Sequence, residues 1–147
     1  MVINAISKPL IYLIEDDQDD QYMFKMILAE LSYDLDVVCF ENGLEAYEYL
    51  TKAAFSEDSE KKNQPDIILL DLNLPVWDGK KTLSVLKKDL RFQAIPIIIY
   101  TTSKSEHDIA ECYSLGANSF ISKAAEYDLL QIQIKTICRY WFNTVLL

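Results

Sequence analysis

Histidine, cysteine and basic residues are all scarce in this sequence of 147 residues. It has one histidine and three cysteines, and its 14 Lys and Arg residues are outnumbered by 23 Asp and Glu residues, which gives a formal net charge of −9. Nucleic acids and anionic lipid surfaces are bound through clustered Lys and Arg side chains. The acidic balance therefore predicts no direct contact with nucleic acid or with an anionic membrane.

The cysteines also lack the pattern of a structural framework. Cys39, Cys112 and Cys138 are odd in number and widely spaced, and no CxxC motif is present. This disfavours a disulfide framework or a zinc site and favours buried, reduced thiols. No apolar run approaches the roughly 18 residues of a membrane span, and the N-terminal segment does not resemble a signal peptide. We therefore expect a cytoplasmic protein.

Short apolar runs are what the sequence does contain. They cover residues 10–14, 36–40, 66–70 and 95–100, with a weaker run at 118–122. Most are continuous rather than alternating, which is typical of strands buried on both faces of a parallel sheet. A polar, charged stretch at 53–65 is expected to be a surface loop.

Segments with helical spacing follow each of these runs. Their apolar residues are Phe24, Ile27, Leu28 and Leu31; Leu44, Tyr47 and Leu50; Leu83, Leu86 and Leu90; Ile109, Cys112 and Tyr113; and Leu130, Ile134, Ile137 and Trp141. Strand and helix thus alternate five times. This order predicts a single domain of the α/β class, with a doubly wound five-stranded parallel sheet.

Polar residues gather where the predicted strands end. Ligands of open α/β sheets bind beyond the carboxyl ends of the strands, where the strand order reverses. The residues found there are Glu15 and Asp16 after the first strand, Asp71 after the third, Thr101 after the fourth and Lys123 after the fifth. The first and third strands are expected to be neighbours, so the three carboxylates should converge.

Three converging carboxylates repel one another, and a divalent cation would relieve that repulsion. Mg²⁺ suits an all-oxygen site, whereas the absence of His and Cys from the cluster disfavours zinc and copper. The single histidine, His107, is expected on the surface at the start of a helix. An Asp beside Mg²⁺, a hydroxyl and an ammonium group can attack phosphorus and become an aspartyl phosphate. The alternative is a purely structural role, in which such acids only cap helices, as Asp19 and Asp20 could.

Four stretches carry a resemblance to a known family: LIYLIEDD, IILLDLNLPVWDG, PIIIYTTS and GANSFISK. Along nearly its whole length the chain resembles the receiver domain of two-component response regulators. The resemblance implies a flavodoxin-like receiver fold with strand order 2-1-3-4-5 flanked by five helices. It also implies a stand-alone receiver over residues 1–147, of the chemotaxis-regulator type, with a core at about 9–142 and no output domain.

The resemblance assigns a role to each residue of the predicted site. Asp71 matches the phosphoacceptor. Asp16 would bind Mg²⁺ directly, Glu15 would bind it through water, and Asn73 would offer its backbone carbonyl. The chain would then be a phosphoacceptor rather than an enzyme, with only self-phosphorylation and slow self-dephosphorylation. Its donor would be a histidine kinase or a histidine phosphotransfer protein.

The same resemblance predicts a switch. Thr101 matches the hydroxyl residue that turns toward the phosphoryl group, Lys123 the lysine that pairs with it, and Phe120 the aromatic switch position. The face made by the fourth helix, fifth strand and fifth helix would then bind a downstream protein. The chain departs from the family pattern at Ala124, where proline is usual, and we expect a trans peptide bond there.

Three further readings remain open. An Asp-nucleophile phosphatase would usually carry a second Asp two residues after the first, where this chain has Asn73. A pseudo-receiver would keep the fold as a binding module without phosphorylation, and Ala124 leaves room for it. Near the C-terminus, Tyr140 or Phe142 is expected to be exposed and could form a homodimer surface.

Overall fold

Five parallel strands form one sheet, in the order β2-β1-β3-β4-β5. The computed structural model describes residues 8–55 and 64–144. Its strands are β1 (Leu10–Ile14), β2 (Asp36–Phe40), β3 (Ile67–Leu70), β4 (Ile97–Thr101) and β5 (Ser119–Ser122). The predicted fold class and strand order are confirmed, and each strand lies within two residues of its predicted bounds.

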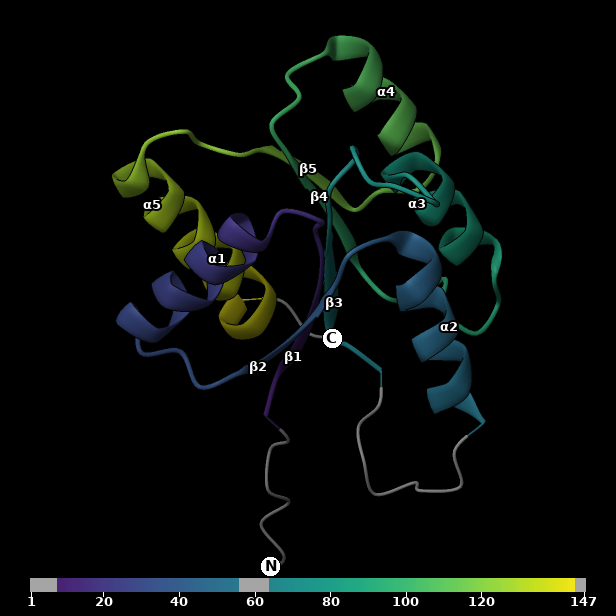
Figure 1. The fold of residues 1–147 in the computed structure, drawn as a ribbon, viewed down its shortest axis with the longest axis horizontal. Helices are drawn as coiled ribbons and strands as arrows, with labels where there is room; N and C mark the ends of the chain where they lie inside the picture. The colour runs from purple at the N-terminus through teal and green to yellow at the C-terminus, as the bar shows by residue number, and fades with distance from the viewer. Residues whose placement is uncertain (1–7, 56–63, 145–147) are drawn as a thin grey trace, which may run out of the picture.

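Helices cover both faces of this sheet. They are α1 (Gln18–Glu30), α2 (Gly43–Ala54), α3 (Gly79–Lys88), α4 (Glu106–Ser114) and α5 (Tyr127–Cys138), followed by a π-helical segment (Arg139–Thr144). Figure 1 shows α1 and α5 on one side of the sheet and α2, α3 and α4 on the other. Within the described residues, we find no helix with the length and apolar character needed to cross a bilayer.

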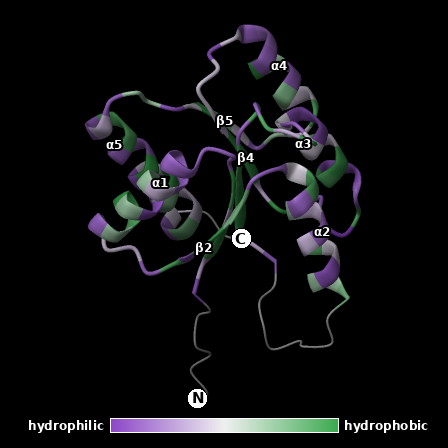
Figure 2. Cartoon of the chain, in the orientation of Figure 1, coloured by the Kyte–Doolittle hydropathy of each residue, from purple (hydrophilic) through white to green (hydrophobic). Residues whose placement is uncertain are grey.

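The strands are apolar on both faces because each face has its own core. Tyr12 and Ile14 of β1 point into the core beneath α2, α3 and α4, whereas Ile11 and Leu13 point into the core beneath α1 and α5. The strands accordingly appear as a green, hydrophobic layer between helices with purple outer faces (Figure 2). Each such side chain contributes about 1.5–3 kcal/mol when fully buried.

Two apolar residues of the predicted helical stripes, Leu90 and Tyr113, are exposed in the structure. Helix α3 ends at Lys88, and Leu90 is 83% exposed rather than part of a buried stripe. The carboxylate of Asp89 accepts a hydrogen bond from the backbone N–H of Arg91 at 3.0 Å, so a turn replaces the helix there. Tyr113 is also exposed, and its hydroxyl accepts a hydrogen bond from the Phe120 N–H.

The predicted loop at 53–65 begins late, because α2 continues through Ala54. Most of that predicted loop, residues 56–63, lies outside the described residues.

The cysteines behave as buried thiols. Cys112 and Cys138 are buried, Cys39 is half-buried, and all three are free. Burial raises the pKa of Cys138 to about 12, so its thiol stays protonated at neutral pH. The single histidine, His107, is exposed in the first turn of α4, as predicted.

Candidate functional site

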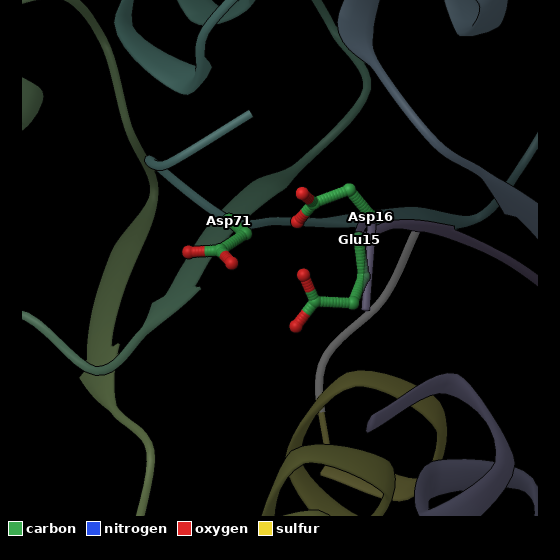
Figure 3. Close-up of side chains that lie close together, drawn as sticks. All are labelled: Glu15, Asp16 and Asp71. Atoms are coloured by element: carbon green, nitrogen blue, oxygen red, sulfur yellow. The ribbon is translucent and has the colours of Figure 1, made fainter. Parts of the chain in front are cut away.

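The ends of β1 and β3 bring three carboxylates together. Ile14 is paired with Leu70 across the two strands, and the Asp71 N–H donates to the Ile14 carbonyl at 3.1 Å. Glu15, Asp16 and Asp71 therefore leave the sheet at the same edge. Each can offer one carboxylate oxygen to a group in which all the oxygens lie within 4.8 Å of one another (Figure 3).

The three carboxylates sit in different environments. Glu15 is buried and Asp16 is exposed, while the Asp71 side chain is 13% exposed. Burial raises the pKa of Glu15 to about 8, although the neighbouring Lys123 ammonium lowers it. One carboxylate oxygen of Glu15 is buried and has no hydrogen-bond partner in the part of the chain that the structure describes. A set of oxygen donors with this excess of negative charge fits a hard divalent cation such as Mg²⁺.

Lys123 places its ammonium group among these acids. It pairs with Glu15, and its Nζ lies 3.5 Å from Asp20 Oδ2 and 3.8 Å from Asp71 Oδ2. The ammonium also stands 5.2 Å from the centre of the Tyr100 ring. Burial lowers the pKa of Lys123, but the surrounding carboxylates outweigh burial and hold that pKa above its ordinary value, so the lysine is charged.

Thr101 and Phe120 lie on neighbouring strands beside this cluster. Thr101 is fully buried at the end of β4, and its hydroxyl oxygen has no hydrogen-bond partner among the described residues. A buried hydroxyl without a partner is costly, and a ligand that bonds to it would recover that cost. Phe120 on β5 is half-buried against the core beneath α2, α3 and α4.

The loop from β3 to α3 holds Asp71 in place. The Leu72 N–H donates to Asp71 Oδ1 at 2.7 Å, and the Gly79 N–H donates to the Leu72 carbonyl at 2.9 Å. Asp78 caps α3 by accepting from the Lys81 N–H at 2.8 Å. Asn73 is exposed in this loop and lines a cavity of about 410 Å³ together with residues of α3 and α4.

Some polar residues of the site were not predicted from sequence. Helix α1 is capped by Asp17, which accepts from the N–H groups of Asp19 and Asp20, rather than by those two residues. The side chain of Asp20 instead reaches Lys123. The run of acidic residues that contains Asp17 and Asp20 did indicate a site at this edge of the sheet. It did not show which acid caps the helix and which one reaches Lys123.

Ala124 stands where the family usually has proline, and its backbone N–H has a hydrogen-bond partner. Within the described residues every peptide bond is trans, including the one between Lys123 and Ala124. The Ala124 N–H, which a proline would lack, donates to Oε1 of Gln133 on α5 at 2.9 Å. No sequence pattern indicated this contact.

The chain is similar in sequence to known proteins along most of its length. Residues 11–135 match the family model of the response regulator receiver domain. Response regulator Rcp1 of Synechocystis is 31% identical over 138 residues, which is 94% of this chain and 92% of Rcp1. The chemotaxis protein CheY1 of Helicobacter pylori is 26% identical, with 85% of this chain and 93% of CheY1 covered.

The structure is also similar to solved structures of response regulators. The phosphorylated cyanobacterial phytochrome response regulator RcpA superposes with a TM-score of 0.84 at 34% identity, over 95% of this chain and 98% of RcpA. The Mn²⁺-bound form of Rcp1 superposes with a TM-score of 0.82 at 30% identity, over 95% and 98% of the two chains. The chain belongs to the family of response regulator receiver domains.

Proposed function

We propose that Asp71 accepts a phosphoryl group and that the resulting change in surface is read by another protein. The observation that carries this proposal is the convergence of Asp71, two further carboxylates and the Lys123 ammonium at one edge of the sheet. The unpartnered hydroxyl of Thr101 at the end of the neighbouring strand supports it.

Phosphoryl transfer to this site needs little covalent chemistry from the protein. One carboxylate oxygen of Asp71 forms the bond to phosphorus, while the bond from phosphorus to the donor's imidazole nitrogen breaks. That nitrogen keeps the electron pair and takes up a proton. Lys123 neutralises an oxygen of the arriving phosphoryl group, and the hydroxyl of Thr101 donates a hydrogen bond to another.

The charge that remains calls for a divalent cation. Glu15, Asp16, Asp71 and the carbonyl of Asn73 would hold Mg²⁺, which supplies positive charge against the phosphoryl oxygens. The Mn²⁺-bound form of the related Rcp1 supports a divalent site in this family member. The preference for Mg²⁺ rests on the all-oxygen donor set.

Contacts from the loop after β4 could carry the change outward to α4. Ser103, two residues after Thr101, donates its hydroxyl to Asp108 of α4 at 2.7 Å. The other carboxylate oxygen of Asp108 accepts from the ammonium of Lys80 on α3 at 2.7 Å. If Thr101 turns toward the phosphoryl group, this network shifts with it. Phe120 then packs further inward, and the face of α4, β5 and α5 changes shape.

The donor and the output follow from the family. We propose a histidine kinase or histidine phosphotransfer protein as donor, and a phytochrome-type kinase as the first to test, because RcpA is a phytochrome response regulator. This chain covers 92% of the response regulator Rcp1, and we propose that it signals through a protein partner.

Intact-mass spectrometry tests the proposal. After incubation with acetyl phosphate and Mg²⁺, the protein is expected to gain one phosphoryl group, and chelation of Mg²⁺ with EDTA should abolish the gain. A purified histidine kinase in place of acetyl phosphate identifies the donor by the same readout. If neither donor adds a group and beryllofluoride also fails to bind, the phosphorylation-independent pseudo-receiver becomes the better assignment.

A phosphatase of external esters is the weaker candidate. Such an enzyme needs an acid to protonate the leaving group, and the position two residues after Asp71 is Asn73, whose amide cannot serve as one. Within the described residues the lone histidine is exposed on α4, paired at 3.4 Å with Glu111 of the same helix. The protein is therefore expected to show no turnover of a chromogenic phosphate ester.

We also propose a homodimer through α5. Leu129 and Ile132 are 51% and 59% exposed, and they lie on one face of α5 because they are three residues apart; Tyr140, in the π-helical segment that follows, is 49% exposed. Phe142, the other residue considered from sequence, packs against the core instead. Acids precede this apolar face and bases follow it, so an antiparallel pair about a two-fold axis would set Asp128 of one copy near Arg139 of the other.

Light scattering checks the dimer. The wild type is expected to be dimeric at micromolar concentration, and Ile132→Ser is expected to shift it to the monomer because it removes the central apolar contact. Thr51→Ser, a substitution on the opposite side of the sheet, is the control. A wild type that stays monomeric at every accessible concentration would contradict the proposal.

A further inference from the structure

The side chain of Gln133 spans the backbone on both sides of Lys123. From α5, its Nε2 donates to the Ser122 carbonyl at 2.8 Å and its Oε1 accepts from the Ala124 N–H at 2.9 Å. The two backbone partners fix which end of the amide is which, because a carbonyl only accepts and an N–H only donates. One side chain therefore ties α5 to the residues that flank the lysine.

The backbone of Lys123 itself is held from the other side. Its N–H donates to the carbonyl of Thr101, the last residue of β4, at 2.6 Å. Lys123 is the first residue after β5, which lies at the edge of the sheet next to β4 alone. The chain then crosses from the sheet to α5. Gln133 thus restrains this crossing at the point where the sheet no longer does.

The position of this backbone decides where the ammonium group lies. A lysine side chain has four rotatable bonds and carries a point charge, so it gives no directional fork of its own. The Lys123 side chain is only 10% exposed, and its Nζ stands 3.8 Å from Asp71 Oδ2 and over the Tyr100 ring. The course of the Lys123 side chain toward the carboxylates is therefore set by the position of its backbone and by the packing around its methylene groups.

We infer that Gln133 is a positioning residue for phosphoryl transfer, which acts by fixing the backbone that aims Lys123 at Asp71. The inference rests on the proposed function, since it concerns the rate of that reaction. Within the described residues the Gln133 side chain makes no hydrogen bond to the carboxylates. Its effect therefore passes through Lys123, whereas the divalent cation would be held by Glu15, Asp16 and Asp71, to which Gln133 makes no hydrogen bond.

The test separates an effect on Lys123 from an effect on the proposed cation ligands. Gln133→Leu keeps the volume and removes both hydrogen bonds, and Gln133→Met does the same with an unbranched chain. Uptake of phosphate from acetyl phosphate is expected to slow about tenfold in either variant, because a displacement near 1 Å at a reacting centre can cost even more. The affinity for Mg²⁺, measured by isothermal titration calorimetry, is expected to stay within about twofold, because the proposed cation ligands are unchanged.

Two controls make the result specific. Gln131→Leu, on the same helix, is expected to leave both quantities unchanged, because the Gln131 side chain makes no hydrogen bond to any described residue. In a Lys123→Met background, where uptake is already slow, Gln133→Leu should cause no further loss, because the lysine through which it acts is gone.

Several outcomes would overturn the inference. These are a wild-type rate in both Gln133 variants, an equal fall in Mg²⁺ affinity that marks general loosening of the site, or a full tenfold loss that persists in the Lys123→Met background. The proposed function fails in a different way. A wild type that takes up no phosphate would overturn that function and this role together, whereas an active wild type with unaffected variants would overturn the role of Gln133 alone.

Discussion

Asp71→Asn is expected to take up no phosphate from acetyl phosphate and yet to unfold at a higher temperature than the wild type when divalent cations are absent. The first effect follows because the amide is a poor nucleophile toward phosphorus. The second follows from the crowding of Glu15, Asp16 and Asp71, whose oxygens lie within 4.8 Å of one another. Lys123 is close to two of these acids and also to Asp20, so one positive charge serves several negative ones.

The expected gain in stability is modest but has a definite sign. Removing one charge from the cluster should raise the free energy of unfolding by on the order of 1 kcal/mol, after the lost attraction to Lys123 is set against the relieved repulsion. In a domain of this size that corresponds to a rise of roughly 2–4 °C in melting temperature. Mg²⁺ is then expected to reverse the order of stability, because a cation that binds the folded wild type more tightly than the folded variant would stabilise the wild type more.

Thermal unfolding with EDTA and with Mg²⁺, next to intact-mass spectrometry, measures both effects. Asp34→Asn is a matched control, since it removes one carboxylate charge from a side chain that is 90% exposed and should change stability by less than about 0.5 kcal/mol. Equal or lower stability of Asp71→Asn in EDTA would contradict the picture of a strained carboxylate cluster. Uptake of phosphate at the wild-type rate would contradict the assignment of Asp71.

The sheet could be predicted because its signal is repeated and local. Each strand is a short, unbroken apolar run, and continuous runs mark strands covered on both faces. The edge of the sheet that carries the candidate site then followed from topology, because parallel strands end at the same edge. The site residues at the carboxyl ends of β1, β3, β4 and β5 could therefore be named before any distance was known.

Errors arose where a local contact overrides periodicity. Leu90 continues the spacing of α3, but the side chain of Asp89 bonds to Arg91 and forms a turn. The contacts of Gln133 were invisible for a related reason. A glutamine on a helix carries no signal for the backbone it will bond to eleven and nine residues away, at Ser122 and Ala124.

Gly79 illustrates how tightly the fold holds the phosphoacceptor loop. This first residue of α3 donates its N–H to the Leu72 carbonyl at 2.9 Å, so the start of the helix lies directly against the segment that follows Asp71. A Cβ at position 79 would lie 2.6 Å from Leu72 Cα and against the Asp71 carbonyl. Both neighbours are backbone atoms and cannot rotate away, so the helix and the loop would have to separate.

Gly79→Ala is therefore expected to lower the free energy of unfolding by about 3 kcal/mol, the upper part of the range for an overpacked site. That loss corresponds to a fall of roughly 6–12 °C in melting temperature. Gly116→Ala is the comparison, since Gly116 has φ +103° and its nearest neighbour is a side-chain atom, Cγ of Lys87, at 3.1 Å rather than a backbone atom. Strain of the backbone alone should cost it about 1–2 kcal/mol.

The ranking of the two glycines, measured by thermal or urea unfolding, is the decisive quantity. A larger loss at Gly79 than at Gly116 would show that close backbone contact, rather than a positive φ, sets the cost at the β3–α3 turn. Gly79→Ala is also expected to bind Mg²⁺ more weakly than the wild type. Two of the proposed cation ligands, the carbonyl of Asn73 and the carboxylate of Asp71, belong to the loop that would have to shift. Wild-type stability in Gly79→Ala would mean that helix and loop are free to part, and Asp71 would then be held by the sheet alone.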